Sequence, residues 1–218
     1  GLLAQQLADK TGQPFLSYAI YRRAQAYIAS PERFDEGDKF PYAKFDIRLS
    51  EKKAQIGFYV EKRDKPMPDR WDWHRLLTAV ADETMQAHLT AVMQQHNLHW
   101  MLEWYEENRP MGETAVYPAK PLRWEEADGA EEITWAEFAA RLQTAPLHQW
   151  IDLRLGQYIA KEEALNAGIT LADRVATVYA ALIPLYNNCT QPVDAMPRFS
   201  DLGSESSFSE KEVFPIIA

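Results

Sequence analysis

Cysteine is nearly absent from this chain of 218 residues, in which Cys189 is the single example. One cysteine cannot form an internal disulfide or supply a multi-cysteine zinc site, so a reducing, cytoplasmic setting fits best. A chain of this length buries roughly 70% of its unfolded surface and needs no disulfide or metal ion to hold its fold. The composition, 46% hydrophobic and 12% aromatic, predicts a packed core.

Long apolar runs are also missing. None approaches the roughly 20 residues that span a bilayer, and the N-terminus lacks a charged-then-apolar signal pattern. We therefore expect a soluble protein with no membrane partner. The chain begins with Gly1 rather than Met, which is consistent with a module of a larger, bacterial-type cytoplasmic protein.

Positive charge is outnumbered. With 23 Lys and Arg against 32 Asp and Glu, the formal net charge is -9 and the pI about 5.1. This acidic character opposes non-specific attraction to phosphate backbones and anionic membranes. It disfavours nucleic acid as a partner without excluding a local basic surface.

Motifs for nucleotide, nucleophilic or metal chemistry are not found. Nine glycines leave little material for a phosphate-binding loop, and there is no P-loop, G-x-G-x-x-G or G-x-S-x-G. No pair among the five histidines has the i, i+4 spacing typical of zinc sites on helices. We predict no cofactor and no resident metal, and favour a non-catalytic protein over an enzyme.

Alternating apolar and polar side chains are the strongest pattern that is present. Residues 42–50 and 54–62 alternate with a period of two, and the short link "SEKK" between them predicts a β-hairpin. Folding the hairpin about this link sets Arg48 opposite Gln55, Asp46 opposite Gly57, and Lys44 opposite Tyr59. The two apolar rows then share one side.

Two later segments alternate in the same way. In residues 98–105, Leu98, Trp100, Leu102 and Trp104 form one row, which we assign to the core because large aromatic side chains dominate core burial. Met101 and Tyr105 remain as candidates for a surface platform. Residues 148–160 predict a further strand that carries Arg154 and Tyr158 on its polar side.

Helices are predicted around these strands. The apolar spacing predicts a short helix near residues 2–10 and a long one over about 71–96 with Asp69 as its N-cap. Thr134 with Glu137, and Thr170 with Asp173, have the spacing of capping boxes. Residues 15–29 suit either a helix or a strand, and we favour a helix. The prolines at 118 and 121 favour an edge strand or extended loop, and the acidic run 125–132 a solvated loop.

The predicted fold is α+β, with a single mostly antiparallel sheet and helices packed on one face. We expect one domain over residues 1–190. Residues 191–218 lose periodicity and gain serine, proline and acidic residues, and they predict a C-terminal tail or linker.

Function is predicted to reside on the polar face of this sheet, which an antiparallel sheet can leave open to water. We interpret the chain as a recognition or interaction domain that binds a protein or a small polar ligand there. Its ligand-binding residues would be Lys44, Asp46, Arg48, Tyr59, Glu61, Arg154 and Tyr158, with Tyr42 beside them. A plain solvated face with cross-strand ion pairs is the competing interpretation.

Two other functions remain open. Arg22 and Arg23, close to Tyr18, Tyr21 and Tyr27, could hold phosphates and stack on bases in a nucleic-acid recognition module. Asp46 with Glu61 and Lys62 superficially resembles the ligand set of a metal-dependent phosphodiesterase or nuclease. The fit is poor, because adjacent Glu61 and Lys62 point to opposite sides of a strand.

Overall fold

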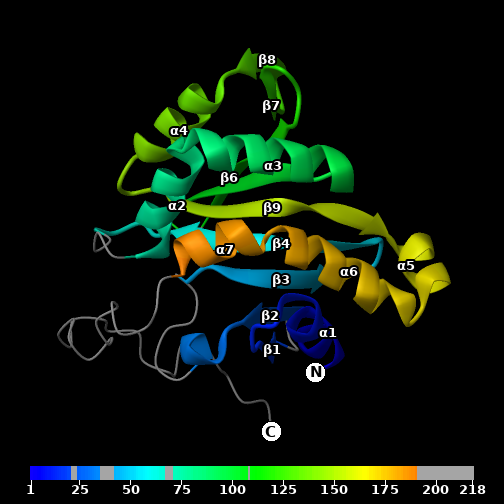
Figure 1. Cartoon of the computed structure of the whole chain (residues 1–218). Helices are drawn as coiled ribbons and strands as arrows, with labels where there is room; N and C mark the ends of the chain where they lie inside the picture. The colour runs from blue at the N-terminus through cyan, green and yellow to red at the C-terminus, as the bar shows by residue number, and fades with distance from the viewer. Residues whose placement is uncertain (21–23, 35–41, 67–70, 108, 191–218) are drawn as a thin grey trace, which may run out of the picture.

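A single antiparallel sheet forms the centre of the molecule in the computed structural model, which describes residues 1–20, 24–34, 42–66, 71–107 and 109–190. Within these residues the strand order is β1-β2-β3-β4-β9-β5-β6-β7-β8, and neighbouring strands are antiparallel (Figure 1). The strands are β1 (Leu16–Ile20), β2 (Gln25–Ala29), β3 (Lys44–Leu49), β4 (Lys53–Lys62), β5 (His99–Glu106), β6 (Arg109–Tyr117), β7 (Leu122–Glu126), β8 (Gly129–Ile133) and β9 (Trp150–Ala160). The predicted α+β class is confirmed.

Helices pack on one face of this sheet, as predicted, and Figure 1 shows α2, α3, α6 and α7 lying across it. The helices are α1 (Leu2–Thr11), α2 (Asp72–Ala81), α3 (Glu83–His96), α4 (Trp135–Gln143), α5 (Lys161–Ala167), α6 (Thr170–Ala181) and α7 (Ile183–Cys189), with a 3-10 turn, η2, at Pro31–Phe34. Phe45 of β3 stacks on Tyr179 of α6 at 4.6 Å and on Tyr186 of α7 at 5.2 Å. Helix α5 was not predicted.

The β3–β4 hairpin has the predicted register, with Lys44 opposite Tyr59, Asp46 opposite Gly57 and Arg48 opposite Gln55. Strand β9 begins about 90 residues after the end of β4 in the chain, but it lies between β4 and β5 in the sheet. It sets Arg154 between Tyr59 and Met101. The centre of the sheet is therefore assembled from distant segments.

The strand predicted in residues 98–105 is present as β5 (His99–Glu106). Trp100 is fully buried against Phe138 of α4, with ring centroids 5.4 Å apart. Trp104 is only partly buried against the core, and its indole Nε1 donates to Thr114 Oγ1 at 3.1 Å. Met101, a candidate for a surface platform, is buried, so that part of the prediction is wrong.

The favoured helix over residues 15–29 is wrong. The described part of this segment forms β1 and β2, which pair with each other, and β2 pairs with β3. Tyr27 and Ile28 of β2 are buried. Pairing with β3 and burial of these side chains outweigh the helix propensity of the alanine, leucine and glutamine residues.

The long helix over 71–96 is interrupted. Asp82 adopts an extended conformation after α2, and its side chain accepts from Met85 N at 2.8 Å, so it caps α3. An aspartate that caps a new helix satisfies backbone donors that an interruption would otherwise leave unpaired. The predicted N-cap Asp69 lies outside the described residues.

Only one of the two predicted capping boxes is present. Thr134 accepts from Glu137 N, and the Glu137 carboxylate accepts from Thr134 N at 2.6 Å, which completes the box at the start of α4. Thr170 instead donates its hydroxyl proton to Ala167 O at 2.7 Å, and Ile169 is the N-cap of α6. Because its hydroxyl is bonded to Ala167 O, Thr170 does not cap α6.

The acidic run 125–132 is a hairpin rather than a loop. Its two halves extend β7 and β8, with Glu125 opposite Ala130, and Glu131 pairs with Arg141 of α4 at 2.8 Å. Pro118 and Pro121 lie in the connection from β6 to β7, and the edge strand at this end of the sheet is β8. Residues 191–218, the predicted tail, lie outside the described residues.

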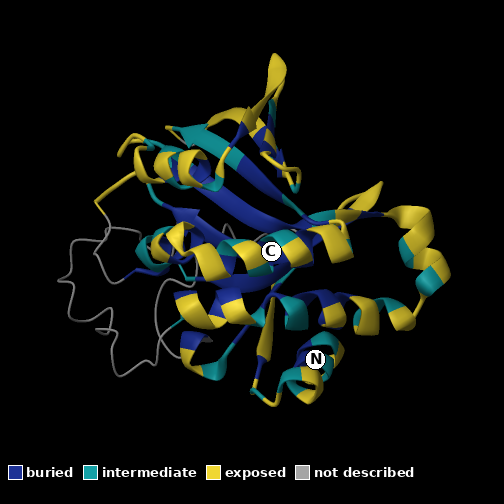
Figure 2. Ribbon diagram, turned by 45° about the horizontal axis from the view of Figure 1, so that its top comes forward, coloured by how far each residue is buried: buried dark blue, intermediate teal, exposed yellow. Residues whose placement is uncertain are grey.

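Among the described residues, no helix combines the length and apolarity needed to cross a membrane. Burial follows the layers of the fold: the central strands are buried, while the helices show exposed outer surfaces (Figure 2). The middle of β4 and of β9 is buried on both faces. The polar side of the sheet is therefore not a simple solvated surface.

Candidate functional site

The predicted polar face exists, but its centre is closed to water. Lys44, Asp46, Tyr59, Glu61 and Arg154 expose at most 2% of their surface. The expectation of an open polar face is wrong at these positions. Polar side chains from neighbouring strands pair with one another, and Lys44 and Arg154 lie against the Tyr59 ring. We call the connected groups the buried ionic network; besides these five residues it includes Gln25, Arg63, Glu103, Trp150 and Asp152.

Arg154 on β9 is the centre of the buried ionic network. Its Nε donates to Asp46 Oδ2 at 3.1 Å, its Nη1 donates to Glu103 Oε1 at 3.3 Å, and its Nη2 lies 3.7 Å from Asp152 Oδ2. The guanidinium carbon lies 4.2 Å from the centre of the Tyr59 ring. One cation therefore serves carboxylates from three strands, which is the geometry that buried charges require.

Glycine at position 57 explains how Arg154 reaches Asp46 across β4. Gly57 is the residue of β4 opposite Asp46, and it faces Gly156 on β9. Because neither glycine has a side chain, nothing on β4 or β9 stands between the guanidinium and the carboxylate at this level. A Cβ on Gly57 would also lie 2.6 Å from Leu155 O, so the backbones approach too closely for any other residue.

The Tyr59 hydroxyl joins two carboxylates. It lies 2.7 Å from Glu61 Oε1 and 2.8 Å from Asp152 Oδ1, and Asp152 also accepts from Trp150 Nε1 at 2.9 Å. A hydroxyl has one proton and can donate to only one of these oxygens at a time. Short contacts to both are satisfied when one carboxyl group is protonated.

Glu61 is the carboxyl group suited to hold that proton. Burial raises the pKa of Glu61 to about 7, against the opposing effects of Lys44 and Arg63. Burial also lowers the pKa of Lys44 to about 8, although Glu61 at 3.8 Å favours its charged form. The two pKa values approach each other, so both groups can exchange protons near neutral pH.

Acceptors outnumber donors at the β2 end of the buried ionic network. Gln25 Nε2 donates to Asp46 Oδ2 at 3.1 Å. Asp46 Oδ1 and Gln25 Oε1 are buried and have no hydrogen-bond donor among the described residues. Two neighbouring side chains therefore keep capacity to accept a hydrogen bond.

The buried ionic network reaches the surface through Glu103. Its Oε1 is shared by Arg154 and by Arg48, whose Nη1 lies at 3.5 Å and whose side chain is 34% exposed. Its Oε2 accepts from the Tyr105 hydroxyl at 2.7 Å. Tyr158 is also exposed on this side of the sheet. We call Arg48, Glu103 and Tyr158 the accessible rim.

The predicted site residues therefore divide into two groups. Lys44, Asp46, Tyr59, Glu61 and Arg154 meet in the buried ionic network, while Arg48 and Tyr158 belong to the accessible rim. Tyr42 contacts the network through its backbone, since its carbonyl oxygen accepts from Lys44 Nζ at 3.1 Å, and its ring lies 5.0 Å from Arg33. The sequence reasoning missed Gln25, Glu103 and Asp152. Alternation marks Glu103 and Asp152 as polar-face residues, but their contact with Arg154 depends on the order of β4, β9 and β5.

The carboxylates proposed for a metal-dependent enzyme have other partners. Asp46 binds Arg154 and Gln25, and Glu61 binds Tyr59 and Arg63. Lys62 donates instead to the carbonyl oxygens of Pro146 and Gln149. Within the described ranges, no cluster of three or more His, Cys, Asp or Glu residues is arranged to hold a metal ion. Arg22 and Arg23, proposed for nucleic-acid binding, lie outside the described residues.

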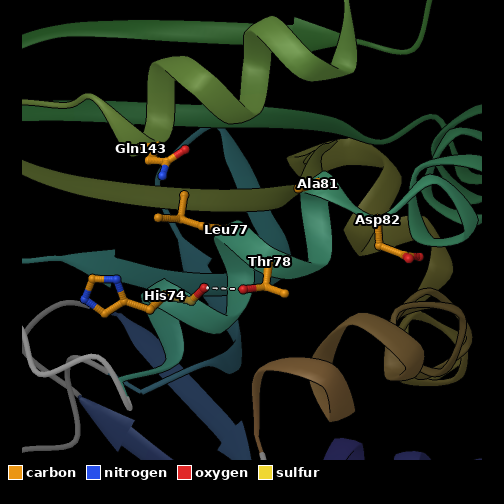
Figure 3. Close-up of a pocket in the computed structure, with 6 residues that line it drawn as sticks. All are labelled: His74, Leu77, Thr78, Ala81, Asp82 and Gln143. Carbon is orange, nitrogen blue, oxygen red and sulfur yellow. Dashed lines mark hydrogen bonds between the residues drawn. The ribbon is translucent and has the colours of Figure 1, made fainter.

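A hollow of about 640 Å³ lies on the helical side, away from the buried ionic network. His74, Leu77, Thr78, Ala81, Asp82 and Gln143 line it (Figure 3). Two of its polar side chains already serve the helices: Thr78 donates to His74 O at 3.2 Å and Asp82 caps α3.

Comparisons with known proteins add no assignment, because no protein-family model matches the chain and no curated protein sequence matches it.

Proposed function

We propose that the domain is a non-catalytic recognition module that binds a polar ligand or a protein through the polar face of its sheet. The observation that carries this proposal is the sharing of Glu103 between buried Arg154 and the accessible Arg48. A surface ligand that contacts Glu103 or Arg48 would bind groups whose positions are fixed by the ion pair of Glu103 with buried Arg154.

Stability alone does not account for the buried ionic network. Removing charges from water is costly, and apolar side chains of similar volume often stabilise a fold equally well or better. Asp46, Glu61 and Arg154 are fully buried. Clusters of charged groups with perturbed pKa values are found preferentially at functional sites, although structural networks also contain them.

The combination of a buried ionic network with an accessible rim suits recognition. Side chains that are already held by hydrogen bonds lose little freedom when a ligand binds, which lowers the entropic cost of association. Glu103 is held from two sides, by Arg154 and by the Tyr105 hydroxyl. It can therefore present a carboxylate in one orientation to a polar group.

A two-dimensional NMR screen of polar small molecules and short peptides tests this proposal. We expect binders to perturb the resonances of Arg48, Glu103 and Tyr158, and we expect the double variant Arg48→Ala with Tyr158→Ala to bind at least tenfold more weakly. Arg174→Ala is the matched control, since Arg174 forms an exposed ion pair with Glu163 outside this face. Binders that perturb only helical residues, or that bind the double variant unchanged, would contradict the proposal.

A further inference from the structure

Three aromatic side chains form a continuous strip that shares Tyr158 with the accessible rim. The His99 ring on β5 stacks on Tyr117 of β6, with centroids 4.9 Å apart and planes at 23°, and lies 5.9 Å from Tyr158 of β9. Tyr117 is 36% exposed and Tyr158 is 39% exposed. We call His99, Tyr117 and Tyr158 the aromatic strip. Its three rings come from three adjacent strands, β9, β5 and β6.

A cation of the chain itself already lies over the face of one of these rings. Lys53 Nζ lies 3.3 Å from the centre of the Tyr158 ring. Within the described part of the chain Lys53 forms no ion pair with a carboxylate. An exposed ammonium group that rests on an aromatic face is held by attraction to the ring quadrupole. Lys53 therefore marks a position on the aromatic strip that favours positive charge.

Two carboxylates, Glu103 and Glu113, lie near Tyr158 of the aromatic strip. Burial raises the pKa of Tyr158, and the nearby Glu113 and Glu103 carboxylates raise it further. Glu113 lies opposite Glu103 on β6, is exposed, and has no ion-pair partner among the described residues. Negative charge beside exposed rings attracts cations and repels phosphate groups.

We infer that the aromatic strip, with Glu113 and Glu103 beside it, binds an alkylammonium group, which takes the place of Lys53 Nζ on the Tyr158 ring. The inference rests on the proposed function, because it identifies the ligand class of the same face. Two sources share this chemistry: a free quaternary ammonium compound, and a lysine side chain of a basic peptide. Rings combined with carboxylates provide what both require.

Phosphate-bearing ligands fit the aromatic strip less well. Exposed rings can stack on bases, but nucleic-acid sites add cations that hold the backbone. Here Glu103 and Glu113 lie near Tyr158, and Arg123 is paired with Glu125 on β7. The net charge of -9 acts in the same direction. Arg48 and Arg154 also lie near Tyr158, but both are already paired with Glu103. Glu113, which has no ion-pair partner among the described residues, therefore favours a cation over an anion at the aromatic strip.

An NMR titration with choline and with 3,3-dimethylbutan-1-ol tests the inference. The two compounds have nearly the same shape, and only choline is charged. We expect choline to shift the ring resonances of His99, Tyr117 and Tyr158, and to bind at least tenfold more tightly than the neutral alcohol. Equal binding of the two compounds, or choline shifts confined to other residues, would overturn the inference.

Three variants make the test independent of folding defects. Tyr158→Ala is expected to lose at least tenfold in choline affinity, while Tyr158→Phe keeps the ring and the affinity. Lys53→Gln removes the competing ammonium group and is expected to tighten choline binding. Weaker binding in Lys53→Gln, or loss in Tyr158→Phe equal to that in Tyr158→Ala, would show that the ring face is not the cation site.

The peptide Gly-Lys-Gly, compared with Gly-Gln-Gly, separates the two sources. Tighter binding of the lysine peptide than of choline assigns the site to a protein partner, and the reverse order assigns it to a free quaternary ammonium compound. Failure of both cations to bind overturns the inference. If other polar ligands still perturb Arg48 and Glu103 in that case, the proposed function stands without it.

Discussion

Arg154 and Asp46 form an ion pair in which both side chains are fully buried, with Arg154 Nε 3.1 Å from Asp46 Oδ2. The two residues lie on strands separated by β4, and 108 positions divide them in the sequence. Their contact depends on the glycine pair between them and connects the two halves of the sheet. The stability of the fold should therefore respond strongly to either partner.

Replacement of Arg154 by methionine should destabilise the protein. Arg154→Met leaves Asp46, Glu103 and Asp152 close together without their shared cation, and breaking a buried pair in this way costs about 3–5 kcal/mol. Urea unfolding monitored by tryptophan fluorescence measures the change. In the exposed pair of Arg174 with Glu163, the same substitution at Arg174 should cost less than about 1 kcal/mol. Similar losses at both arginines would contradict a central role for Arg154.

Alanine at Gly57 should also be costly. Its Cβ would lie 2.6 Å from Leu155 O, and a backbone atom in the middle of a sheet cannot move aside easily. We expect a loss on the order of 1–3 kcal/mol, as for overpacked cores. Gly112→Ala is the control within the same sheet, because no heavy atom lies within 4 Å of its Cβ position. A thermal melting midpoint unchanged in Gly57→Ala would refute the close approach.

The protonation of Glu61 should make stability depend on pH. Its pKa is raised by burial from an ordinary value of 4.5 to about 7, so between these values the native state holds a proton that the unfolded chain has lost. The contribution of Glu61 to stability is therefore complete below about pH 4.5 and declines as pH rises to 7. Glu61→Gln should remove this decline.

Urea unfolding at pH 5 and pH 8 measures the effect of Glu61→Gln. The variant should gain stability relative to the parent protein at the higher pH. Asp72→Asn provides a comparison. Burial raises the pKa of Asp72 to about 6, so the decline in its contribution to stability ends at a lower pH than the decline for Glu61. An identical difference between Glu61→Gln and the parent at both pH values would count against a protonated Glu61.

The two predicted capping boxes should differ in their response to alanine. Thr134→Ala removes a hydroxyl that accepts from Glu137 N, and such losses cost about 0.5–2 kcal/mol. Thr170→Ala removes only a hydrogen bond to Ala167 O, which lies outside α6, and should therefore cost less than Thr134→Ala. Urea midpoints of the two variants compare them directly. A larger loss at Thr170 would reverse our assignment of the caps.

Local pattern was sufficient for some elements. The register of the β3–β4 hairpin follows from alternation and a short link, because both strands and their connection are contiguous in the chain. Trp100 was placed in the core for the same reason, since the apolar row of β5 has no other place to be buried. Local pattern was not sufficient for residues 15–29, because their side chains divide between helix and strand propensity. Pairing of β2 with β3 favours the strand.

The sequence by itself determined which side chains share a face of each strand, since the period of two is a property of the local backbone. Only the tertiary structure decided which strands are neighbours, and hence that Arg154 meets Asp46 and Glu103. It also decided that this polar face is buried at its centre. Strand order depends on contacts between distant segments, and an alternating pattern carries no information about its neighbour.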